Sequence, residues 1–564
     1  MRILFDLSTP GYLRFFDATF DELGRRGHEV AISFTSLQVH PGARESLQDL
    51  EHPPRDLGLS TRRTDELAVL ARGLRAAIDY VRYLDPAYAD ADFLRNRARE
   101  RALRYGPFSR PFASLRRLRP GQVAVLMRAL EAAERAVPSS AEVERFVRAA
   151  NPDLVLVSPL LVGGSPQTDL VKSARALGIP NGVCVASWDN LTNKGHMRIV
   201  PDRVVVWNHD QVREAVELHG VPEDRVQVTG AQPYDRWFGR EPSTTREAFC
   251  AKVGLPADRP FVLFCASLSN IGEGVEQAFV ARWREAIRAR HGDGVSVLVR
   301  PHPERLGHWD GLFEDDPTAA VWPTSMHNLL AEETRDGFFD SLFHSAAIVG
   351  TNTSAMIEAA IAGRPVLTVR ASEFEQSQSG TLHFQYLRPE HGGFVEEAWS
   401  LEQHLDQLSA AVEDPSRHRE ANARFVARFI RPHGMDRPCT PILVAAIEEM
   451  DGSPAPRPEP PAGRSLAALA LRGLARAVAL RERVREPEAA KDTARLVARP
   501  LRRLAKRAPR HSRLSVSSRV AARRIEQLGR SRRDRLRAAR VDRTAERKAV
   551  AARGGHMLDP DRVG

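Results

Sequence analysis

Short apolar runs alternate with amphipathic helical segments twice along this chain of 564 residues, and this alternation limits the possible folds more than any other feature. The first series contains runs such as RILFDL, PDLVLVS and DRVVVW, and a second series begins after residue 238 with RPFVLFCAS, GVSVLVR, AAIVG and RPVLTV. Such alternation with short connections is typical of a parallel sheet with helices on both faces. We therefore predict an α/β protein with two doubly wound domains, residues 1–238 and 239–450, that face a cleft.

Two further segments are set apart by composition. Residues 63–150 have helical periodicity, abundant Arg, Ala and Leu and little strand signal, which predicts a helical insertion in the first domain. Residues 400–450 are expected to form helices that pack back across both domains. Residues 451–564 begin with the proline-rich linker SPAPRPEPPAG and continue as an arginine-rich tail, helical or disordered, without a core of its own.

The charge of the chain is divided unevenly. The formal net charge of +10 is the sum of +19 from residue 452 onward and −9 over residues 1–451. In RSLAALALRGLARAVALRERV, a helical wheel places Arg472, Arg476 and Arg483 in one sector beside leucines, which suits a helix lying on an anionic membrane surface. A solvated tail is the alternative. Nucleic acid is a weaker candidate partner, because the body is acidic and no binding motif accompanies the arginines.

The cysteines and the N-terminus point to the cytoplasm. The four cysteines are widely spaced without a CxxC or Cys/His cluster, so we expect no metal site and no disulfide framework. Asp6 lies inside the only N-terminal apolar stretch, and no run of 18 apolar residues occurs, which predicts neither a signal peptide nor a membrane span. We expect a cytoplasmic protein that the tail would bring to the inner face of the membrane.

Hydroxyl and acidic side chains follow one strand of the second domain. In GTNTSAMIEAAIAGRPV a predicted strand ends at Gly350 and a helix begins near Ser354. Thr351, Thr353 and Ser354 supply hydroxyls and backbone N–H groups at the helix start, which suits the diphosphate of a nucleotide. Glu358, one turn later, is placed to accept hydrogen bonds from ribose hydroxyls. The alternative is a plain helix cap with a solvated glutamate.

Two other strands of the second domain end in candidate phosphate loops, because ligands of open α/β sheets bind beyond the carboxyl ends of the strands. Arg300 and His302 stand in the sequence RPHP and could bind a phosphate or support a leaving group, although an isolated HP dipeptide is usually only a turn. The loop CASLSNIGEG lacks the P-loop pattern but can approach a phosphate closely. Its candidate residues are Ser267, Ser269, Asn270 and Gly272.

The first domain offers the loop ASWDNLTNKG, residues 186–195, after the run GVCV. Asp189 is a candidate general base and Lys194 its electrostatic partner, whereas the alternative is a capped turn with a packed Trp188. A glycine-bearing turn near the N-terminus is expected to face the same cleft. The predicted cleft or acceptor residues are Gly11, Tyr12, Arg14, Trp188, Asn190 and Lys194.

These motifs together resemble the GT-B glycosyltransferases, which have two Rossmann-like domains. The resemblance rests on RRGHEV, VTGAQPYD, RPHP and GTNTSAMIEAAIAGRPV and covers about residues 1–450 apart from the insertion. Within the superfamily the chain is most similar to CDP-glycerol glycerophosphotransferases and related capsule transferases. It also resembles the UDP-N-acetylglucosamine 2-epimerases.

The resemblance implies roles for three residues: His302 matches the HP histidine, Ser354 the phosphate-binding serine and Glu358 the ribose-binding acid. The chain has Thr351-Asn352 where glycerophosphotransferases have an acidic-aromatic pair, and SWDN at 187–190 where epimerases have His-x-Glu-Ala-Gly. The first departure counts against CDP-glycerol as the donor, and the second favours transfer over epimerisation.

The resulting expectation is a metal-independent transferase without a cofactor. It would move a sugar or polyol phosphate from a nucleotide-activated donor to an acceptor, such as a lipid-linked one, in cell-surface polysaccharide or glycolipid synthesis. A nucleotide-sugar 2-epimerase and a non-catalytic scaffold that binds membrane or nucleic acid are the alternatives.

Overall fold

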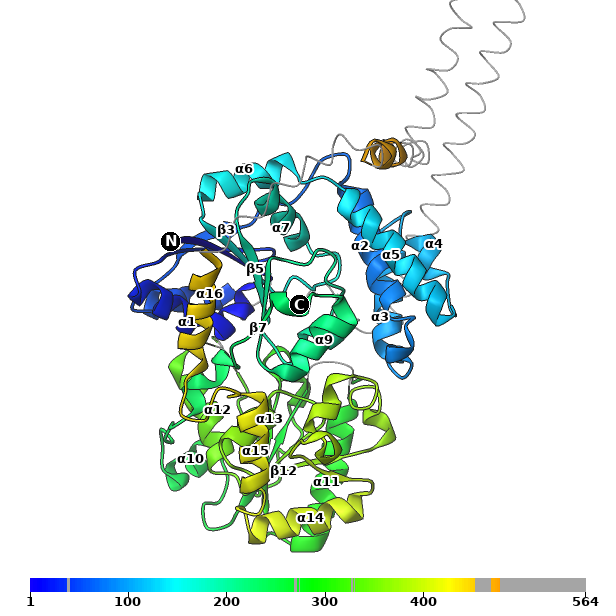
Figure 1. The fold of residues 1–564 in the computed structure, drawn as a ribbon. Helices are drawn as coiled ribbons and strands as arrows, with labels where there is room; N and C mark the ends of the chain where they lie inside the picture. The colour runs from blue at the N-terminus through cyan, green and yellow to red at the C-terminus, as the bar shows by residue number, and fades with distance from the viewer. Residues whose placement is uncertain are drawn as a thin grey trace, which may run out of the picture. The chain divides into compact units, whose positions relative to one another are not determined.

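A computed structural model of the chain describes residues 1–37, 41–267, 271–272, 274–325, 328, 330–451 and 468–476. The chain divides into two compact units, Met1–Gly463 and Arg464–Gly564. The first unit contains both sheets (Figure 1). Of the second unit only residues 468–476 are described, and they form a helix. The predictions for the rest of the tail lie outside the described residues.

The first sheet has seven parallel strands in the order β3-β2-β1-β4-β5-β6-β7. Strand β1 is buried at five of its six residues, which is why its sequence is a nearly continuous apolar run. The exception is Asp6, whose buried carboxylate accepts hydrogen bonds from Ser33 at 2.7 Å and Gln167 at 2.9 Å. The strands are β1 (Arg2–Leu7), β2 (Glu29–Phe34), β3 (Arg55–Leu59), β4 (Leu154–Ser158), β5 (Asn181–Cys184), β6 (Arg203–Val206) and β7 (Val226–Val228). Its helices include α1 (Leu13–Arg25), α6 (Ala141–Ala150), α7 (Gln167–Ala176), α8 (Asn190–Asn193) and α9 (His209–His219).

The second sheet has six parallel strands in the order β10-β9-β8-β11-β12-β13, so the predicted fold of two doubly wound α/β domains is confirmed. The strands are β8 (Phe261–Cys265), β9 (Ser296–Arg300), β10 (Ala319–Val321), β11 (Ala347–Gly350), β12 (Val366–Val369) and β13 (Glu396–Ala398). The helices are α10 (Arg246–Val253), α11 (Val275–His291), α12 (Glu332–Phe343), α13 (Ala355–Ile361), α14 (Leu401–Glu413) and α15 (Arg419–Phe429).

The register of the second sheet positions the candidate loops. Strand β8 lies between β9 and β11, and Cys265 at its end pairs with Arg300 on one side and Gly350 on the other. The loops that follow these three strands therefore leave the same edge of the sheet side by side.

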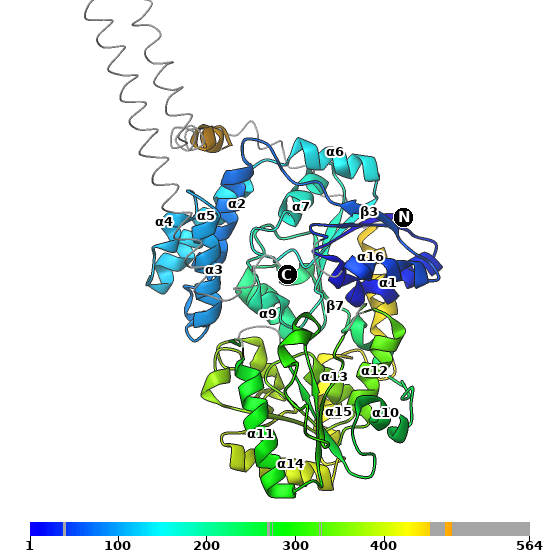
Figure 2. The same ribbon diagram turned by 180° about the vertical axis from the view of Figure 1, so that it is seen from behind.

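The predicted helical insertion is present and lies beside the first sheet (Figures 1 and 2). Its helices are α2 (Ala68–Arg82), α3 (Asp92–Arg104), α4 (Arg110–Ala113) and α5 (Pro120–Ala136). Helix α6 instead packs Val143 and Val147 into the core of the first domain. A buried ion network joins the insertion to α7: Arg75 contacts Glu134 at 3.0 Å and Asp169 at 2.7 Å. Such a pair is costly to break, because the remaining charge would be buried alone.

The last helices cross between the domains, as predicted. Leu408 of α14 and Phe425 of α15 lie in cores of the second domain. Helix α16 (Cys439–Asp451) returns to the first domain, where Ile447 joins the core. Glu448 of α16 also contacts Arg26 at 2.8 Å. In the part of the chain that the structure describes, no helix has the length and apolar character needed to cross a bilayer.

A 3-10 helix of the second domain, η8 (His383–Leu387), contacts the first domain directly. The Tyr386 hydroxyl donates a hydrogen bond of 2.7 Å to Glu214 of α9, whose side chain is buried. The His383 ring meets the Trp188 ring edge-on, with 4.7 Å between centroids. The interface therefore buries the Glu214 carboxyl group, which has no charged partner within hydrogen-bond distance among the described residues.

Glu214 is expected to make stability fall as pH rises. Burial raises the pKa of Glu214 to about 8, against the opposing hydrogen bond from Tyr386. An unfolded glutamate titrates near about 4.3. Between these values the folded state binds more protons than the unfolded state, so the free energy of unfolding decreases with pH in this window. Glu214→Gln, which keeps an acceptor for Tyr386, should gain thermal stability relative to the wild type as pH increases from 5 to about 8.5.

Melting temperatures measured across this pH range test the expectation. The exposed Glu217 on the same helix provides the matched control, Glu217→Gln. A stability difference between Glu214→Gln and the wild type that does not vary with pH would contradict it.

Candidate functional site

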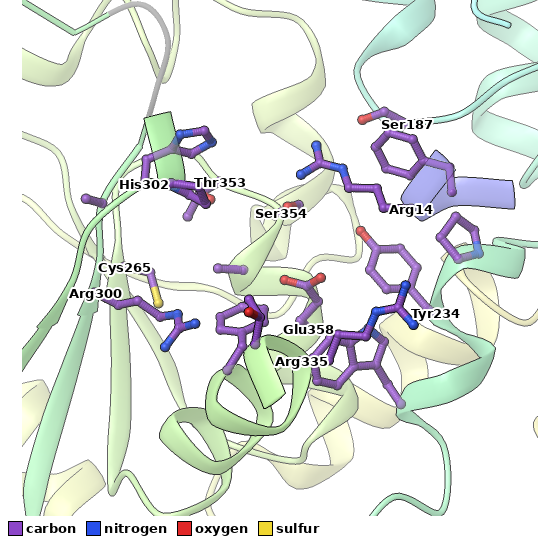
Figure 3. Close-up of a pocket in the computed structure, with 18 of the residues that line it drawn as sticks. Arg14, Ser187, Tyr234, Cys265, Arg300, His302, Arg335, Thr353, Ser354 and Glu358 are labelled. Atoms are coloured by element: carbon purple, nitrogen blue, oxygen red, sulfur yellow. The ribbon is translucent and has the colours of Figure 1, made fainter. Parts of the chain in front are cut away.

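A cavity of about 220 Å³ lies between the two domains (Figure 3). Helix α1 of the first domain contributes Arg14, and the loop after β5 contributes Ser187. The 3-10 helix η5 (Gln232–Trp237), which links the domains, contributes Tyr234 and Arg236. The second domain contributes residues from β8, from β9 and the loop after it, from α12, and from the β11–α13 loop and α13: Cys265, Arg300, His302, Arg335, Thr353, Ser354 and Glu358.

The cavity brings together residues that the sequence singled out in separate loops. These residues are Arg14, Arg300, His302, Thr353, Ser354 and Glu358. The common strand edge explains this convergence for the second domain, because β9 and β11 flank β8 and end at the same level. Arg14 reaches the cavity from the first turn of α1.

Arg300 is a buried cation that has no anionic hydrogen-bond partner among the described residues. Its side chain lies between Trp322 and Phe338, with the guanidinium 5.1 Å and 4.8 Å from the two ring centroids. The residue is 8% exposed, and its Nη1 has no hydrogen-bond partner. Figure 3 shows the guanidinium extending from β9 into the cavity. Burial lowers its pKa to about 10, so it is still charged at neutral pH. A buried charge without hydrogen bonds is unfavourable, and an anionic ligand would supply them.

Glu358 is the carboxylate of the cavity, and Figure 3 shows it projecting from α13 into the space. Burial raises its pKa to about 7, although Arg14, Arg300 and Arg236 favour the ionised form. It therefore titrates close to neutral pH, in a position where a ligand hydroxyl could donate to it.

The cavity carries an excess of positive charge. Four of its lining residues are arginines, and Glu358 is the acidic residue in the lining. Asp17 of α1 binds both Arg236 and Arg335, which ties the first domain to the linker and to α12. Arg14 and Arg300 are left without a carboxylate in hydrogen-bond contact in the described chain. This distribution favours a ligand with phosphate groups.

Ser267 and Thr351 are turned toward a buried carboxylate instead of the cavity. Glu276, in the first turn of α11, accepts hydrogen bonds from the Ser267 backbone N–H at 3.0 Å and the Thr351 hydroxyl at 3.1 Å. The two hydroxyls also bond to each other at 2.7 Å. These side chains are therefore engaged within the protein and are not available to a diphosphate in this arrangement. Gly272 is exposed and outside the cavity lining, and Ser269 and Asn270 lie outside the described residues.

Sequence reasoning missed Glu276, Asp17 and Arg335. An acidic residue in the first turn of a predicted helix, as at Glu276, was the available signal, since such residues often bind nearby backbone N–H groups. Asp17 and Arg335 gave no comparable signal, because they are far apart in the sequence and meet only in the folded chain.

The Asp189 side chain does not line the cavity, but it is hydrogen-bonded to Ser187, which does. Its carboxylate accepts hydrogen bonds from the Ser187 hydroxyl at 2.6 Å and from Asn193 at 3.2 Å. Burial favours the neutral acid, but Lys194, His383 and these hydrogen bonds outweigh it and lower the pKa to about 2. Ser187 lines the cavity and Asp189 does not. The role of Asp189 as a general base stays a prediction, and it would require Ser187 to carry the proton.

Of the predicted cleft residues, only Arg14 lines this cavity. Trp188 packs against the His383 ring, and Asn190 accepts the Ala186 backbone N–H at 3.2 Å. Lys194 offers its backbone carbonyl to the Tyr83 hydroxyl at 2.6 Å. Gly11 and Tyr12 form the turn η1 (Pro10–Tyr12) before α1, outside the lining. These residues therefore make contacts within the protein instead of lining the cavity.

One group of possible metal ligands occurs among the described residues, although the sequence predicted none. Ligand atoms of Asp21, Glu51 and His52 lie within 4.8 Å of one another. Glu51 is exposed, and none of the three lines the interdomain cavity.

Comparisons with known proteins identify no family for this chain. No known protein family and no curated protein sequence matches it. Among solved structures, UDP-GlcNAc 2-epimerase from Neisseria meningitidis matches with 14% identity and a TM-score of 0.45, covering 80% of this chain and 100% of that one. A glycosyltransferase from Rickettsia africae matches with 10% identity and a TM-score of 0.46, covering 80% and 97%. UDP-GlcNAc 2-epimerase from Methanocaldococcus jannaschii matches with 11% identity and a TM-score of 0.45, covering 80% and 99%. Similarity at this level assigns no activity to the chain.

Proposed function

We propose that this protein is a metal-independent glycosyltransferase, or a related polyol-phosphate transferase, that uses a nucleotide-activated donor. The observation that carries the proposal is Arg300, a buried cation without a hydrogen-bonding anion in an arginine-rich cavity between two domains. The diphosphate of a nucleotide sugar would supply the missing acceptors, and charge-assisted hydrogen bonds of this kind are strong.

The proposed reaction uses fixed charges at the leaving group. The bond between the sugar and the diphosphate breaks while a bond forms to an acceptor hydroxyl, and negative charge develops on the departing nucleotide. Arg300 and His302, at the end of β9, would stabilise that charge. Ser354 and Thr353 would bind phosphate oxygens from the β11–α13 loop. Enclosure of the donor between the domains would exclude water and limit hydrolysis.

Glu358 is proposed to bind the ribose of the donor. Replacing Glu358 by alanine should weaken binding of nucleoside diphosphates by about 1 to 3 kcal/mol, the usual loss for hydrogen bonds to a charged group. Calorimetric titration with UDP, CDP, GDP and ADP measures the effect. Glu333→Ala removes an exposed carboxylate from neighbouring α12 and serves as the control. Unchanged nucleotide affinity in Glu358→Ala would count against this placement.

A panel of nucleotide sugars tests the proposed activity. The purified full chain is incubated with each donor, with and without membrane lipid extract, and nucleotide release is followed. We expect one donor to release its nucleotide in a manner that depends on an acceptor in the extract. A changed nucleotide sugar without acceptor would identify an epimerase, and failure of every nucleotide to bind would indicate a non-catalytic scaffold.

The basic tail is proposed to hold the protein at the cytoplasmic face of anionic membranes, near a lipid-linked acceptor. The support is its charge of +19 from residue 452 onward. The full chain should sediment with anionic liposomes, whereas a chain ending at Met450 should stay in the supernatant. Equal sedimentation of the two would exclude the tail as the membrane-binding part.

A further inference from the structure

A second cavity, of about 700 Å³, lies between the helical insertion and the first domain. One wall comes from the end of α2, the following turn and α5 of the insertion. The other wall comes from residues 196–200 and the end of α9. None of its lining residues lines the interdomain cavity, so it is a separate site.

Arginines outnumber carboxylates in the lining of this cavity, although Arg198 pairs with Asp79 and Arg175 with Asp202. Six arginines and three carboxylates line it: Arg82, Arg128, Arg135, Arg175, Arg198 and Arg225, with Asp85, Glu131 and Glu217. Two of the carboxylates are engaged: Glu131 contacts His196 at 2.9 Å, and Asp85 accepts the Ala87 backbone N–H at 2.9 Å. Within the described chain, the exposed side chain of Arg128 and the half-buried side chain of Arg225 have no ion-pair or hydrogen-bond partner. Both guanidinium groups are therefore free to bind an anionic ligand.

Apart from His196, His219 and Gly220, apolar side chains form the rest of the lining. Val123 and Met127 come from one face of α5, and Tyr88, Met197, Ile199 and Leu218 lie around them. Two methionines in such a wall allow it to adapt to an apolar ligand of variable shape. The combination of unpaired cations and an apolar wall suits a molecule with one anionic end and an apolar body.

A buried histidine in the wall has unused hydrogen-bonding capacity. His196 is 5% exposed, stacks on His219 with 5.4 Å between ring centroids, and leaves Nδ1 without a hydrogen-bond partner. Its Nε2 donates to the Glu131 carboxylate, so the unpartnered Nδ1 is an acceptor that a ligand O–H could satisfy.

We propose that this cavity binds an amphiphilic anion, a phosphate monoester with an apolar chain. The unpaired arginines would bind the phosphate, and the α5 wall would bury the chain. This site does not depend on the proposed transferase activity, and its test fails or succeeds separately.

Calorimetric titration of the full chain with dodecyl phosphate, below its micelle concentration, tests the proposal. We expect saturable binding that weakens by about 10- to 100-fold in the double variant Arg128→Ala/Arg225→Ala, since each arginine would contribute charge-assisted hydrogen bonds. Met127→Gln should weaken it less. Arg117→Ala, an exposed arginine of the insertion outside the cavity lining, should bind as the wild type does. All variants keep the basic tail, so a loss of dodecyl phosphate binding that is confined to the cavity variants would place the binding site in the cavity.

Two further ligands and a mapping measurement complete the design. Inorganic phosphate should bind much more weakly than dodecyl phosphate, and dodecyltrimethylammonium should not compete with it. Hydrogen exchange should slow in α5 and residues 196–200 when dodecyl phosphate is bound. Equal affinity for inorganic phosphate would exclude the apolar wall as part of the site. Unaltered dodecyl phosphate binding in the double variant would overturn the proposal.

Discussion

Arg300→Met should weaken binding of nucleoside diphosphates by about 100-fold, or close to 3 kcal/mol. The guanidinium is buried, so its attraction to a phosphate is only weakly screened by solvent. Methionine retains an apolar stem that can pack between Trp322 and Phe338. The variant should also melt at a higher temperature than the wild type without ligand, because it no longer buries an unsatisfied cation.

The two effects together separate a ligand-binding role from simple damage. Calorimetry with nucleoside diphosphates gives the affinity, and thermal unfolding of the ligand-free protein gives the stability. Arg364→Met is the matched control, since Arg364 also lies over an aromatic ring, 5.0 Å from the centroid of Phe343, but outside the cavity. If Arg300→Met binds nucleotides as the wild type does, Arg300 has no part in donor binding and the proposed function loses its main support.

Asp189→Asn and Ser187→Ala should each lower turnover by about 10² to 10⁴-fold, the usual contribution of a positioned base, with donor affinity little changed. The 2.6 Å bond from the Ser187 hydroxyl to Asp189 connects the cavity to the carboxylate behind it. An acceptor hydroxyl would pass its proton to Ser187 while Ser187 passes its own to Asp189. Because both residues would serve one proton path, the double variant should be no slower than the slower single variant.

Nucleotide release from the donor identified in the panel measures this prediction. Ser139→Ala is the control, since Ser139 makes an equally short bond, 2.6 Å, to Glu144 outside the cavity. Near-normal turnover in Ser187→Ala would show that Asp189 does not accept a proton through Ser187. Multiplicative losses in the double variant would show that the two residues act independently and would reject the shared proton path.

The sequence alone determined the fold class and the edge of the sheet where the ligand loops lie. The runs VLF in β8, VSVLV in β9 and AIV in β11 are apolar on both faces, which is typical of central parallel strands. Central strands of one parallel sheet must end at a common edge, so the RPHP loop and the loop after Gly350 converge. The predicted roles of Arg300, His302, Ser354 and Glu358 in one site rest on this local patterning. The short strands β3 and β13 escaped prediction, because they are edge strands with weak apolar patterns.

Only the tertiary structure decided which polar side chains face the cavity. Ser267 and Thr351 stand in loops of the predicted kind, yet both bond to Glu276, and the Thr351–Glu276 contact joins residues 75 positions apart. Asp17 pairs with Arg335 across 318 positions, and Asp189 is hydrogen-bonded to Ser187 without lining the cavity itself. Periodicity reports which face of a strand or helix is buried, since that depends on neighbours in the sequence. The partner of a polar group depends on how elements that are distant in the sequence pack together. The hydrogen bonds and ion pairs of the cavity could therefore be known only from the structure of both domains.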